Sequence, residues 1–555
     1  MNLKRTKIIC TIGPATQSYS SLKNLKGAGM DVVRINMSHS DHKFAKKVIE
    51  RTKKLNKTLS NPIGILLDTQ GPEIRTGDTS QIIDLRPGEK VAITVRDETD
   101  VETTSIHVNY EELINKVKVG SLISVDNGLM NFEVLQKDET LLYCKVLHGG
   151  KLGSKRHVNI PGVRIDLPSL TDKDKKDILF GMKQDIDFIA LSFVRSASDV
   201  EDLKGFLKSR LKKVKIISKI EDEEGLANID LITRVSDGVM VARGDLGIET
   251  DLANLPNIQR KIMHRCAKWG RRSIVATHLL ESMINNPIPT RAEVTDVANA
   301  IYEGADAVML SGETSIGSYP VECVEFISRI AEQTEKYSTL GYEKDLHLES
   351  DWHHLGVAAK NIAEQIKADG IIAITRSGLT AQIVSNAKPL SMPVFAFTNN
   401  RKTLRQMSLS GSLVNYYSPI SEDHEKTVKQ VLKILKNAVI NGLIDNESLK
   451  MIEGVFKVSE VQVREIMIPR PHMIVIDISD LIGDIIKKVA TSGHSRFPVI
   501  DDNRDEIIGV LLAKDLIKRS MKDDNEDFDL YELLRPAVFV PESKRLNILL
   551  NEFKS

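Results

Sequence analysis

Two carboxylates and a lysine stand at the ends of two consecutive apolar runs in the middle of the chain. Lys219 and Glu221 lie in VKIISKIE, and Asp245 closes GVMVARGD. Residues two apart on a strand point to the same side, so Lys219 and Glu221 are expected to face one ligand. A pair of carboxylates suits magnesium, which prefers few carboxylates together with waters and substrate oxygens. The pattern favours phosphoryl transfer, in which catalysis is mostly positioning and charge neutralisation.

Each of these features also has a plainer interpretation. The acidic stretch KIEDEEG could simply start a helix, and Asp245 could be a turn aspartate. Arg34 and Arg75 add planar groups that bind carboxylate or phosphate, and Gly244 lets backbone amides approach an anion closely. The position of these residues in the fold decides between the two interpretations.

Eight short apolar runs follow one another between Lys7 and Glu313, and each ends in or beside a polar or charged residue. Amphipathic stretches with helical spacing, such as HKFAKKVIERTKKL, separate most of them. This order predicts an α/β fold, a (β/α)8 TIM barrel whose active site lies at the carboxyl ends of the strands. The residues at these strand ends are Arg34, Asn36, Asp68, Lys219, Glu221, Asp245, Thr277 and Glu313. One or two of them could be ordinary loop residues.

A β-rich segment interrupts the order after the third run. Short alternating segments such as KVAITV and LLYCKVL replace the helical spacing from about Gly71 to Pro168. We predict a small β-barrel lid domain over 71–167, inserted in a barrel domain made of 1–70 and 168–341. Such a lid could exclude water from a reactive intermediate, although a purely structural insertion is the alternative.

A further α/β unit is expected over 342–442. GIIAITRSGLTAQIVSNA has the pattern of a strand, a turn and a helix, and PVFAFT that of a strand. The turn offers hydroxyls and helix amides to a phosphate, although a helix N-cap explains the same residues better. The turn residues are Thr375, Ser377, Gly378 and Thr380.

The composition limits the location and the partners. A length of 555 residues suggests roughly three to five domains. Lysine plus arginine and aspartate plus glutamate both total 76, so no net charge attracts nucleic acid or an anionic membrane. The four cysteines are scattered and predict a reducing, cytoplasmic location. The first apolar run breaks too early for a signal peptide, and no later stretch is long enough to span a bilayer.

Successive motifs in the first part of the chain resemble those of pyruvate kinase. They lie in order between Arg5 and Thr314, and a looser resemblance continues to near Ala438. The motifs are RTKIICTIGPAT, VVRINMSHS, LLDTQGPEIRTG, NIPGV, SKIEDEEGL, DGVMVARGDLGIE, PTRAEVTDVANAI and DAVMLSGET. The resemblance implies transfer of the phosphoryl group of phosphoenolpyruvate to ADP in glycolysis, giving pyruvate and ATP. It also implies Mg²⁺ (or Mn²⁺) and K⁺ as cofactors, and a homotetramer.

The resemblance implies a role for each matching residue at the reacting centre. Arg34 would hold the phosphate of phosphoenolpyruvate, and Lys219 would stabilise the transferring group and the enolate left behind. Glu221 and Asp245 would bind the divalent ion. The backbone of Gly244 and Asp245 would receive the substrate carboxylate, and Thr277 would position the enolate and its protonation.

The resemblance also implies a monovalent cation site and a nucleotide site. Glu73 is the residue type that accompanies potassium dependence, because an acidic group there asks for a compensating cation. The monovalent cation would be bound by Asn36, Ser38, Asp68 and Thr69. The nucleotide would face Asn36, His39, Arg75 and Arg156.

The chain departs from the family pattern in two places. In the lid, lysine and glycine usually precede VN, whereas this chain has Lys155, Arg156 and His157, so a stiffer loop is expected. After Ala438 the family normally continues with a strand opened by Gly-Asp and a strand after a Gly-Thr-Thr-Asn-like turn. Neither motif is found, so the α/β domain is expected to be incomplete, with an exposed strand edge.

From about Leu443 the chain instead resembles CBS-domain proteins associated with magnesium and cobalt efflux. We predict a partial CBS region over 443–555, with one module from roughly Ile466 to Ile517 and the opening of a second. CBS modules usually bind adenine nucleotides in pairs. Gly509 and Asp515 fit the ribose-contacting pattern, while Leu512 stands where serine or threonine is expected. Two incomplete families in one chain suggest a fusion by deletion or an error of gene assembly.

Two other functions compete with the kinase. The chain could be a CBS-type adenine-nucleotide-binding regulatory protein with an inactive kinase barrel, but intact Lys219, Glu221, Asp245 and Thr277 argue against it. A barrel lyase or mutase acting on phosphoenolpyruvate or pyruvate would need neither the β-rich lid nor GPEIRTG.

Overall fold

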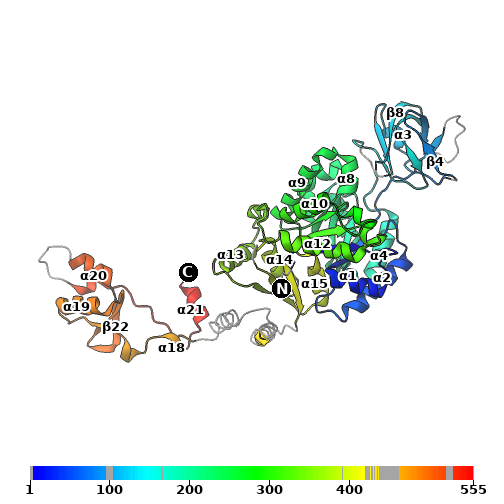
Figure 1. Ribbon diagram of the computed structural model, residues 1–555. Helices are drawn as coiled ribbons and strands as arrows, with labels where there is room; N and C mark the ends of the chain where they lie inside the picture. The colour runs from blue at the N-terminus through cyan, green and yellow to red at the C-terminus, as the bar shows by residue number, and fades with distance from the viewer. Residues whose placement is uncertain are drawn as a thin grey trace. The chain divides into compact units, whose positions relative to one another are not determined.

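The eight apolar runs form a closed barrel of parallel strands in the computed structural model (Figure 1). Its register brings Asn36 level with Asp68 and Ala242 level with Ala276. The predicted TIM barrel is therefore confirmed. In barrel order its strands are β1 Lys7–Thr11, β16 Ala307–Leu310, β15 Arg272–Ala276, β14 Gly238–Ala242, β13 Lys215–Ile220, β12 Phe188–Leu191, β3 Gly64–Asp68 and β2 Val32–Asn36.

The structure describes residues 4–79, 81–95, 104–126, 128–163, 167–389, 392–418, 462–520 and 529–553, together with positions 426, 429, 432, 433 and 436. The chain divides into two units, Met1–Gln430 and Val431–Ser555, and each is described by itself. No helix in the described ranges is long and apolar enough to cross a membrane.

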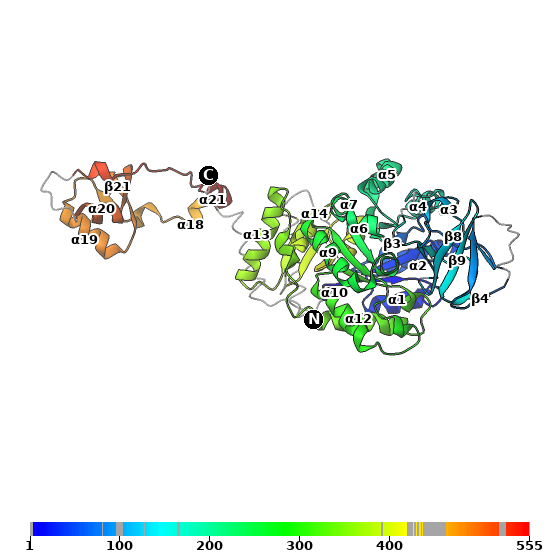
Figure 2. The same ribbon diagram turned by 90° about the horizontal axis from the view of Figure 1, so that it is seen from above.

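Helices surround the barrel, as the view from above shows (Figure 2). The predicted helical stretch HKFAKKVIERTKKL is confirmed in α2. The helices of this layer are α1 Tyr19–Ala28, α2 His42–Asn56, α4 Asp172–Lys183, α5 Ala197–Leu207, α6 Glu223–Ala227, α7 Ile229–Val235, α8 Arg243–Glu249, α9 Leu255–Lys268, α10 Arg291–Tyr302, α11 Gly312–Ser315 and α12 Pro320–Thr334.

The barrel strands are mainly apolar because both of their faces are covered. Side chains that point inward fill the barrel in one buried cluster, which includes Ile9, Leu66, Ile217, Met240 and Ile274. Side chains that point outward pack against the helices in a second, larger cluster. The barrel interior is therefore a packed core, and polar groups are left to its two ends.

A capping box at the start of α4 also holds the end of β3. Thr171 Oγ1 accepts a hydrogen bond from Asp174 N at 3.1 Å, and Thr171 N donates to Asp174 Oδ2 at 3.1 Å. The other carboxylate oxygen of Asp174 accepts from the backbone of Gln70 at 3.0 Å and of Gly71 at 3.3 Å. One side chain thus fixes the point where the chain leaves the barrel for the inserted segment.

The inserted segment between β3 and β12 has its own apolar core, with Phe132, Leu142 and Val146 fully buried. It contains the short helix α3 Leu113–Lys116. Among the described residues its strands form a six-stranded and a two-stranded sheet, and one segment bridges both edges of the first, Arg75 to His157 and Thr76 to Val108, as in the small β-barrel that was expected. The first has the order β11 Val158–Asn159, β7 Leu122–Val125, β8 Met130–Lys137, β9 Leu141–His148, β5 Lys90–Thr94 and β6 Ser105–His107, and the second pairs β10 Gly150–Leu152 with β4 Ile83–Leu85.

A three-stranded parallel sheet follows the barrel in the chain, in the order β17 Ile371–Ile374, β18 Val394–Thr398 and β19 Leu413–Tyr417. It packs with α13 Asp351–Gln365, α14 Leu379–Asn386 and α15 Arg401–Gln406. Gly378 is the N-cap of α14 with φ 89°, and its N–H donates to Thr375 Oγ1 at 2.9 Å. The predicted absence of two family strands directly after Ala438 concerns positions outside the described residues.

This α/β domain is joined to the amino ends of the barrel strands, opposite the candidate site. Lys388 Nζ is 2.6 Å from Asp306 Oδ1, directly before β16. Arg405 Nε is 2.9 Å from Asp187 Oδ1, directly before β12, and Lys7 Nζ donates to Leu413 O at 2.7 Å. Buried ion pairs of this kind fix the docking because an unpaired partner would leave a buried charge.

The second unit contains a three-stranded sheet, β20 Ile476–Asp477, β21 Arg496–Asp501 and β22 Asn503–Leu512. Its apolar core includes Ile476, Phe497 and Leu511. The α-helices in its described residues are α18 Val463–Ile466, α19 Ile482–Ser492, α20 Ala513–Ser520 and α21 Leu546–Glu552.

Truncating a side chain inside the barrel is expected to lower the free energy of unfolding. Ile217 is 1% exposed, so Ile217→Ala leaves a cavity that costs about 2 to 5 kcal/mol, and Ile217→Val about 1 kcal/mol. Urea unfolding in a Trp352→Phe background would measure this through Trp269, the other of the two tryptophans, which ends α9. An Ile217→Ala protein that unfolds at the wild-type urea concentration would contradict a packed barrel core.

Candidate active site

The polar ends of the barrel strands meet at one rim of the barrel. Arg34 and Asn36 come from β2, Asp68 from β3 and Lys219 from β13. Glu221 follows β13, Asp245 lies on α8 after β14, and Thr277 follows β15. Residues far apart in the sequence are thereby placed at one edge, as predicted.

Asp68 lies between two cations. Arg34 Nε and Nη2 are each 2.7 Å from Asp68 Oδ2, and Lys219 Nζ is 3.2 Å from Asp68 Oδ1. Burial acts to raise the pKa of Asp68, but Lys219 and Arg34 outweigh it and hold that pKa below its ordinary value. The carboxylate therefore stays ionised and fixes both cations at the rim.

Lys219 is held by oxygen atoms of three side chains. Besides Asp68, its Nζ lies 2.8 Å from Ser192 Oγ and 2.9 Å from Glu221 Oε1. Ser192 is fixed in turn, because its hydroxyl donates to Thr69 O at 2.8 Å. Burial acts to lower the pKa of Lys219, but Asp68 and Glu221 raise it above its ordinary value. The ammonium is therefore permanently charged. We call Arg34, Asp68, Lys219 and Glu221 the charge cluster.

Glu221 and Asp245 are the two carboxylates that could hold a divalent cation. Phe193 N donates to Glu221 Oε2 at 2.7 Å. Burial raises the pKa of Glu221 to about 7, with Lys219 opposing the rise and Asp245 adding to it. Two carboxylates that repel each other, one buried and one partly exposed, are a donor set that Mg²⁺ would neutralise.

The protein supplies only part of a coordination shell at this place. Within the described residues, no three histidine, cysteine or acidic side chains are grouped so that they could hold a metal ion. A divalent cation between Glu221 and Asp245 would therefore need oxygens from a ligand or from water. This arrangement is typical of magnesium and fits the two residues present.

The turn after β15 has an uncommon backbone conformation. Thr277 has φ 67° and His278 has φ 52°, a left-handed conformation that costs free energy in residues other than glycine. Thr277 Oγ1 accepts a hydrogen bond from Gly244 N at 2.9 Å. The conformation thus turns the threonine hydroxyl toward the start of α8, beside Asp245.

Arg243 holds this turn in place. Its Nη2 donates to Thr277 O at 2.6 Å and to His278 O at 3.2 Å. Its Nη1 lies 2.8 Å from both carboxylate oxygens of Asp296 on α10. The rigid guanidinium contacts several partners at once, which a lysine ammonium on a flexible stem does less well.

Several side chains with oxygen atoms that could coordinate a cation lie where β2 and β3 end. Asn36 Oδ1 accepts from Ser38 N at 3.0 Å, and Ser38 Oγ donates to Glu73 Oε1 at 3.3 Å. Glu73 also accepts from Arg75 Nε at 2.7 Å. Together with Asp68 and Thr69, these groups form an oxygen-rich corner that could bind a monovalent cation. We call Asn36, Ser38, Asp68, Thr69 and Glu73 the cation corner.

A cavity of about 830 Å³ opens beside the charge cluster. Its walls include Arg34, Asn36, His39 and Gly312. Burial and the neighbouring Arg75 lower the pKa of His39, with Glu73 opposing and Arg34 adding to the shift. Arg34 in the wall would attract an anionic ligand to this large cavity, and a neutral His39 could form a hydrogen bond with it.

The arrangement as a whole suits transfer of a charged group between two anionic ligands. Arg34 and Lys219 offer two fixed cations, and Glu221 and Asp245 offer a place for a divalent cation. Such groups stabilise charge on transferring oxygens without forming a covalent intermediate.

Comparison with protein families gives three matches along the chain. Residues 3–324 match the pyruvate kinase barrel domain, 353–459 match the pyruvate kinase alpha/beta domain, and 463–522 match the CBS domain. A pyruvate kinase of Staphylococcus epidermidis is 38% identical over 530 residues, which cover 94% of this chain and 88% of that protein. The chain belongs to the pyruvate kinase family.

Relatives in other groups of organisms are also named pyruvate kinases. Plastidial pyruvate kinase 3 of Arabidopsis thaliana is 39% identical over 459 residues, covering 81% of this chain and 79% of its own. A crystal structure of a pyruvate kinase from Cryptosporidium parvum has a TM-score of 0.75 and 34% identity, covering 80% of this chain and 92% of that one. The kinase fold is thus confirmed, and the inactive-scaffold alternative loses support, since the relatives are named as enzymes.

Two residues predicted to act at the rim have other contacts in the structure. Arg156 Nη1 pairs with Asp126 Oδ1 at 3.2 Å, within the lid. Glu313 accepts hydrogen bonds from the backbone of Leu280 at 3.1 Å and Ser311 at 2.7 Å, so it holds loops together. In the CBS-matching unit, Asp515 pairs with Arg535 at 2.9 Å. The nucleotide role of Arg156 and the CBS nucleotide pattern stay predictions.

Three residues at the rim were not predicted from the sequence. Ser192 follows a buried strand as an ordinary small polar residue, and Arg243 lies in ARGDLG next to the more conspicuous Asp245. The third is His157, which stands where the pyruvate kinase pattern has glycine. Its Nδ1 lies 3.6 Å from Asp245 Oδ1. Positive φ occurs at Lys155 instead, with φ 57°, so the loop does not use a glycine at position 157.

Substituting Arg243 is expected to disturb the Thr277 turn without unfolding the barrel. In Arg243→Lys one charge remains for Asp296, but the contacts to Thr277 O and His278 O are lost, so kcat of the kinase reaction should fall about tenfold or more. Arg329→Lys on the exposed face of α12 is the control and should keep the wild-type kcat. An Arg243→Lys enzyme with unchanged kcat would show that the turn holds itself.

Proposed function

We propose that this chain transfers the phosphoryl group of phosphoenolpyruvate to ADP and releases pyruvate and ATP. The observation that carries the proposal is the charge cluster, in which two buried cations share one carboxylate at the mouth of a pyruvate kinase barrel. We also infer a cytoplasmic enzyme, in agreement with the free and buried state of Cys10, Cys144, Cys266 and Cys323.

Phosphoenolpyruvate is assigned to the charge cluster and the start of α8. Arg34 and Lys219 would bind the phosphoryl oxygens on the two sides of Asp68. The substrate carboxylate would accept hydrogen bonds from the backbone amides of Gly244 and Asp245. Because Gly244 N already donates to Thr277 Oγ1, the carboxylate would take over this donor and leave the threonine hydroxyl free.

ADP is assigned to the 830 Å³ cavity, whose wall includes Asn36 and His39. Arg75 and Arg156 would meet the phosphates from the lid side. In the transfer step, a terminal oxygen of ADP attacks phosphorus in line and the bond from phosphorus to the enol oxygen breaks. Lys219 then neutralises the enolate oxygen, and a proton reaches the methylene carbon near Thr277 to give pyruvate. No side chain is phosphorylated.

Two cations complete the proposed site. Glu221 and Asp245 would hold Mg²⁺ (or Mn²⁺), which when bound supplies neutralisation of phosphoryl and enolate oxygens. Asn36, Ser38, Asp68 and Thr69 would hold K⁺. Their oxygens come from the paired ends of β2 and β3. A homotetramer is expected by analogy with the family.

Removing the Lys219 ammonium is expected to abolish the transfer. Lys219→Met keeps an unbranched side chain one atom shorter and loses the charge, so kcat should fall by about a thousandfold, with ATP and pyruvate lost in parallel. Lys215→Met, on the same strand but paired with Asp237 at its other end, is the matched control and should stay active. Soluble wild-type protein that makes no ATP from phosphoenolpyruvate, ADP, Mg²⁺ and K⁺ would refute the proposed function.

A cation introduced at position 73 is expected to replace potassium. Glu73 lies within hydrogen-bonding distance of Ser38 in the cation corner, so Glu73→Lys places an ammonium there and should make the rate in Na⁺ approach the rate in K⁺. Glu73→Gln removes the same negative charge without supplying a cation, so its rate in Na⁺ should stay at least about tenfold below that in K⁺. Wild-type activity that is equal in Na⁺ and K⁺ would contradict the monovalent cation site.

A further inference from the structure

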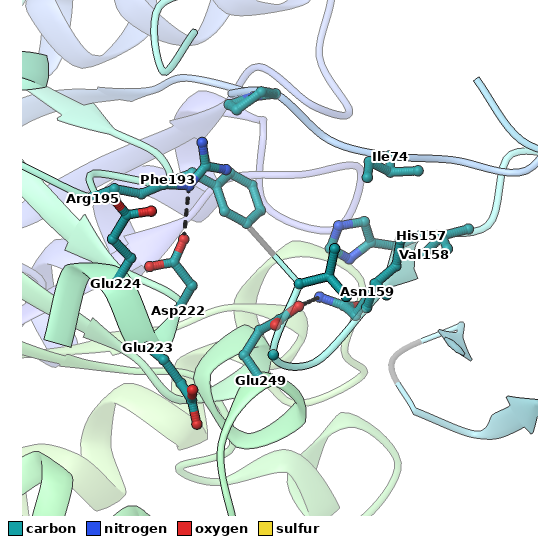
Figure 3. A pocket seen from close by; sticks show the side chains of 14 residues that line it. Ile74, His157, Val158, Asn159, Phe193, Arg195, Asp222, Glu223, Glu224 and Glu249 are labelled. Carbon is teal, nitrogen blue, oxygen red and sulfur yellow. Dashed lines mark hydrogen bonds and ion pairs between the residues drawn. The ribbon is translucent and has the colours of Figure 1, made fainter. Parts of the chain in front are cut away.

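A second cavity, of about 210 Å³, lies between the lid and the barrel (Figure 3). Its lid wall contains Ile74 and the segment from His157 to Val163, and its barrel wall contains Phe193, Arg195, the acidic residues 222–224 and Glu249. We call it the hinge cavity. None of the residues assigned above to phosphoenolpyruvate, ADP or the cations lines it.

A buried acceptor in this cavity has no donor. Asn159 on β11 is 3% exposed, and its Nδ2 donates to Glu249 Oε1 at 2.8 Å (Figure 3). Its Oδ1 accepts no hydrogen bond from any residue in the described part of the chain. Leaving a buried carbonyl oxygen unpaired costs about 1 to 3 kcal/mol, so a ligand that brings an N–H or O–H donor would be favoured here.

The charges around the cavity select a cation. Its wall carries Asp222, Glu223, Glu224 and Glu249 against one arginine, Arg195, whose Nε is paired with Asp222 Oδ2 at 3.0 Å. Burial raises the pKa of Glu249 to about 7, the hydrogen bond from Asn159 opposes it, and Asp222, Asp245 and Glu223 add to the rise. The strongest charges acting on Glu249 are therefore all negative, and an added cation would relieve them.

Apart from His157, most of the remaining wall is apolar, which suits a hydrocarbon group better than a bare ion. Ile74, Val158, Ile160 and Val163 line the cavity from the lid, and Phe193 presents an aromatic ring from the barrel. A ligand with one cationic N–H donor group and an aliphatic body matches both parts of the wall.

We propose that the hinge cavity binds an aliphatic primary ammonium compound. Its ammonium group donates to Asn159 Oδ1 and to the carboxylate of Glu249, and its hydrocarbon chain packs between the lid valines and Phe193. Because Asn159 belongs to the lid and Glu249 to α8 of the barrel, the ligand bridges the two and favours the lid position seen in the structure.

The test is isothermal titration calorimetry of the full chain with n-butylammonium, in a buffer that saturates the protein with K⁺. The neutral compound 1-butanol has the same number of heavy atoms and is the ligand control. Saturable binding of the amine and none of the alcohol is expected. Glu249→Gln should weaken amine binding about tenfold or more, because the charged hydrogen bond is lost.

Three further variants test whether the amine binds in this cavity and not elsewhere. Glu325→Gln on exposed α12 removes one surface charge and should leave the affinity unchanged. Glu73→Gln alters the cation corner, where an ammonium ion could replace K⁺, and should also leave the affinity unchanged. Val163→Phe narrows the cavity from its rim without touching a charge and should weaken binding at least as much as Glu249→Gln.

The outcomes are distinct. Equal binding of amine and alcohol, no binding at all, or an affinity that falls in Glu73→Gln but not in Glu249→Gln would each overturn the proposal. Since binding is measured without phosphoenolpyruvate or ADP, the result does not depend on the proposed kinase activity.

Discussion

The ion pairs around Asp68 are the interaction on which the rest of the site depends. A buried carboxylate without partners would take up a proton, and two buried cations without a carboxylate would repel each other. Placing Asp68 between Arg34 and Lys219 solves both problems and leaves one net positive charge before Glu221 is counted. Glu221, once ionised, makes the cluster neutral, so an incoming phosphoryl group and a divalent cation would enter as a matched pair of charges.

This cluster can form only because three strands end at the same level. Asn36 and Asp68 are paired in the register of β2 and β3, and Lys219 comes from β13, which is separated from β3 by β12 alone. A shift of one residue in any of these strands would turn the polar side chain into the apolar interior or the helix layer. The packed interior around Ile217 therefore does more than stabilise the barrel: it fixes the register that sets the distances at the rim.

The sequence was sufficient to predict the parts of the site that follow from strand periodicity. Arg34, Asp68, Lys219 and Glu221 were predictable because each one ends or follows a buried run, and the carboxyl ends of a parallel barrel share one rim. The contacts of Ser192, Arg243 and His157 were not, because each depends on a neighbour that is distant in sequence. Arg243 contacts the backbone of Thr277, and His157 contacts Asp245 from the lid. Glu313 also follows a barrel strand, but its carboxylate accepts hydrogen bonds from the backbone amides of Leu280 and Ser311, a contact that the strand-end rule does not predict.

The lid is tied to the barrel at the same helix that borders the reacting centre. His157 meets Asp245 near the start of α8, and Asn159 meets Glu249 at its end. Both residues lie on one short stretch of lid backbone, so any movement of the lid loosens both contacts together. A side chain at position 157 where the family pattern has glycine adds the first of these contacts without demanding a left-handed backbone there. The lid of this chain is thereby linked to a carboxylate proposed to bind the divalent cation, so occupancy of that site and the position of the lid should influence each other in both directions.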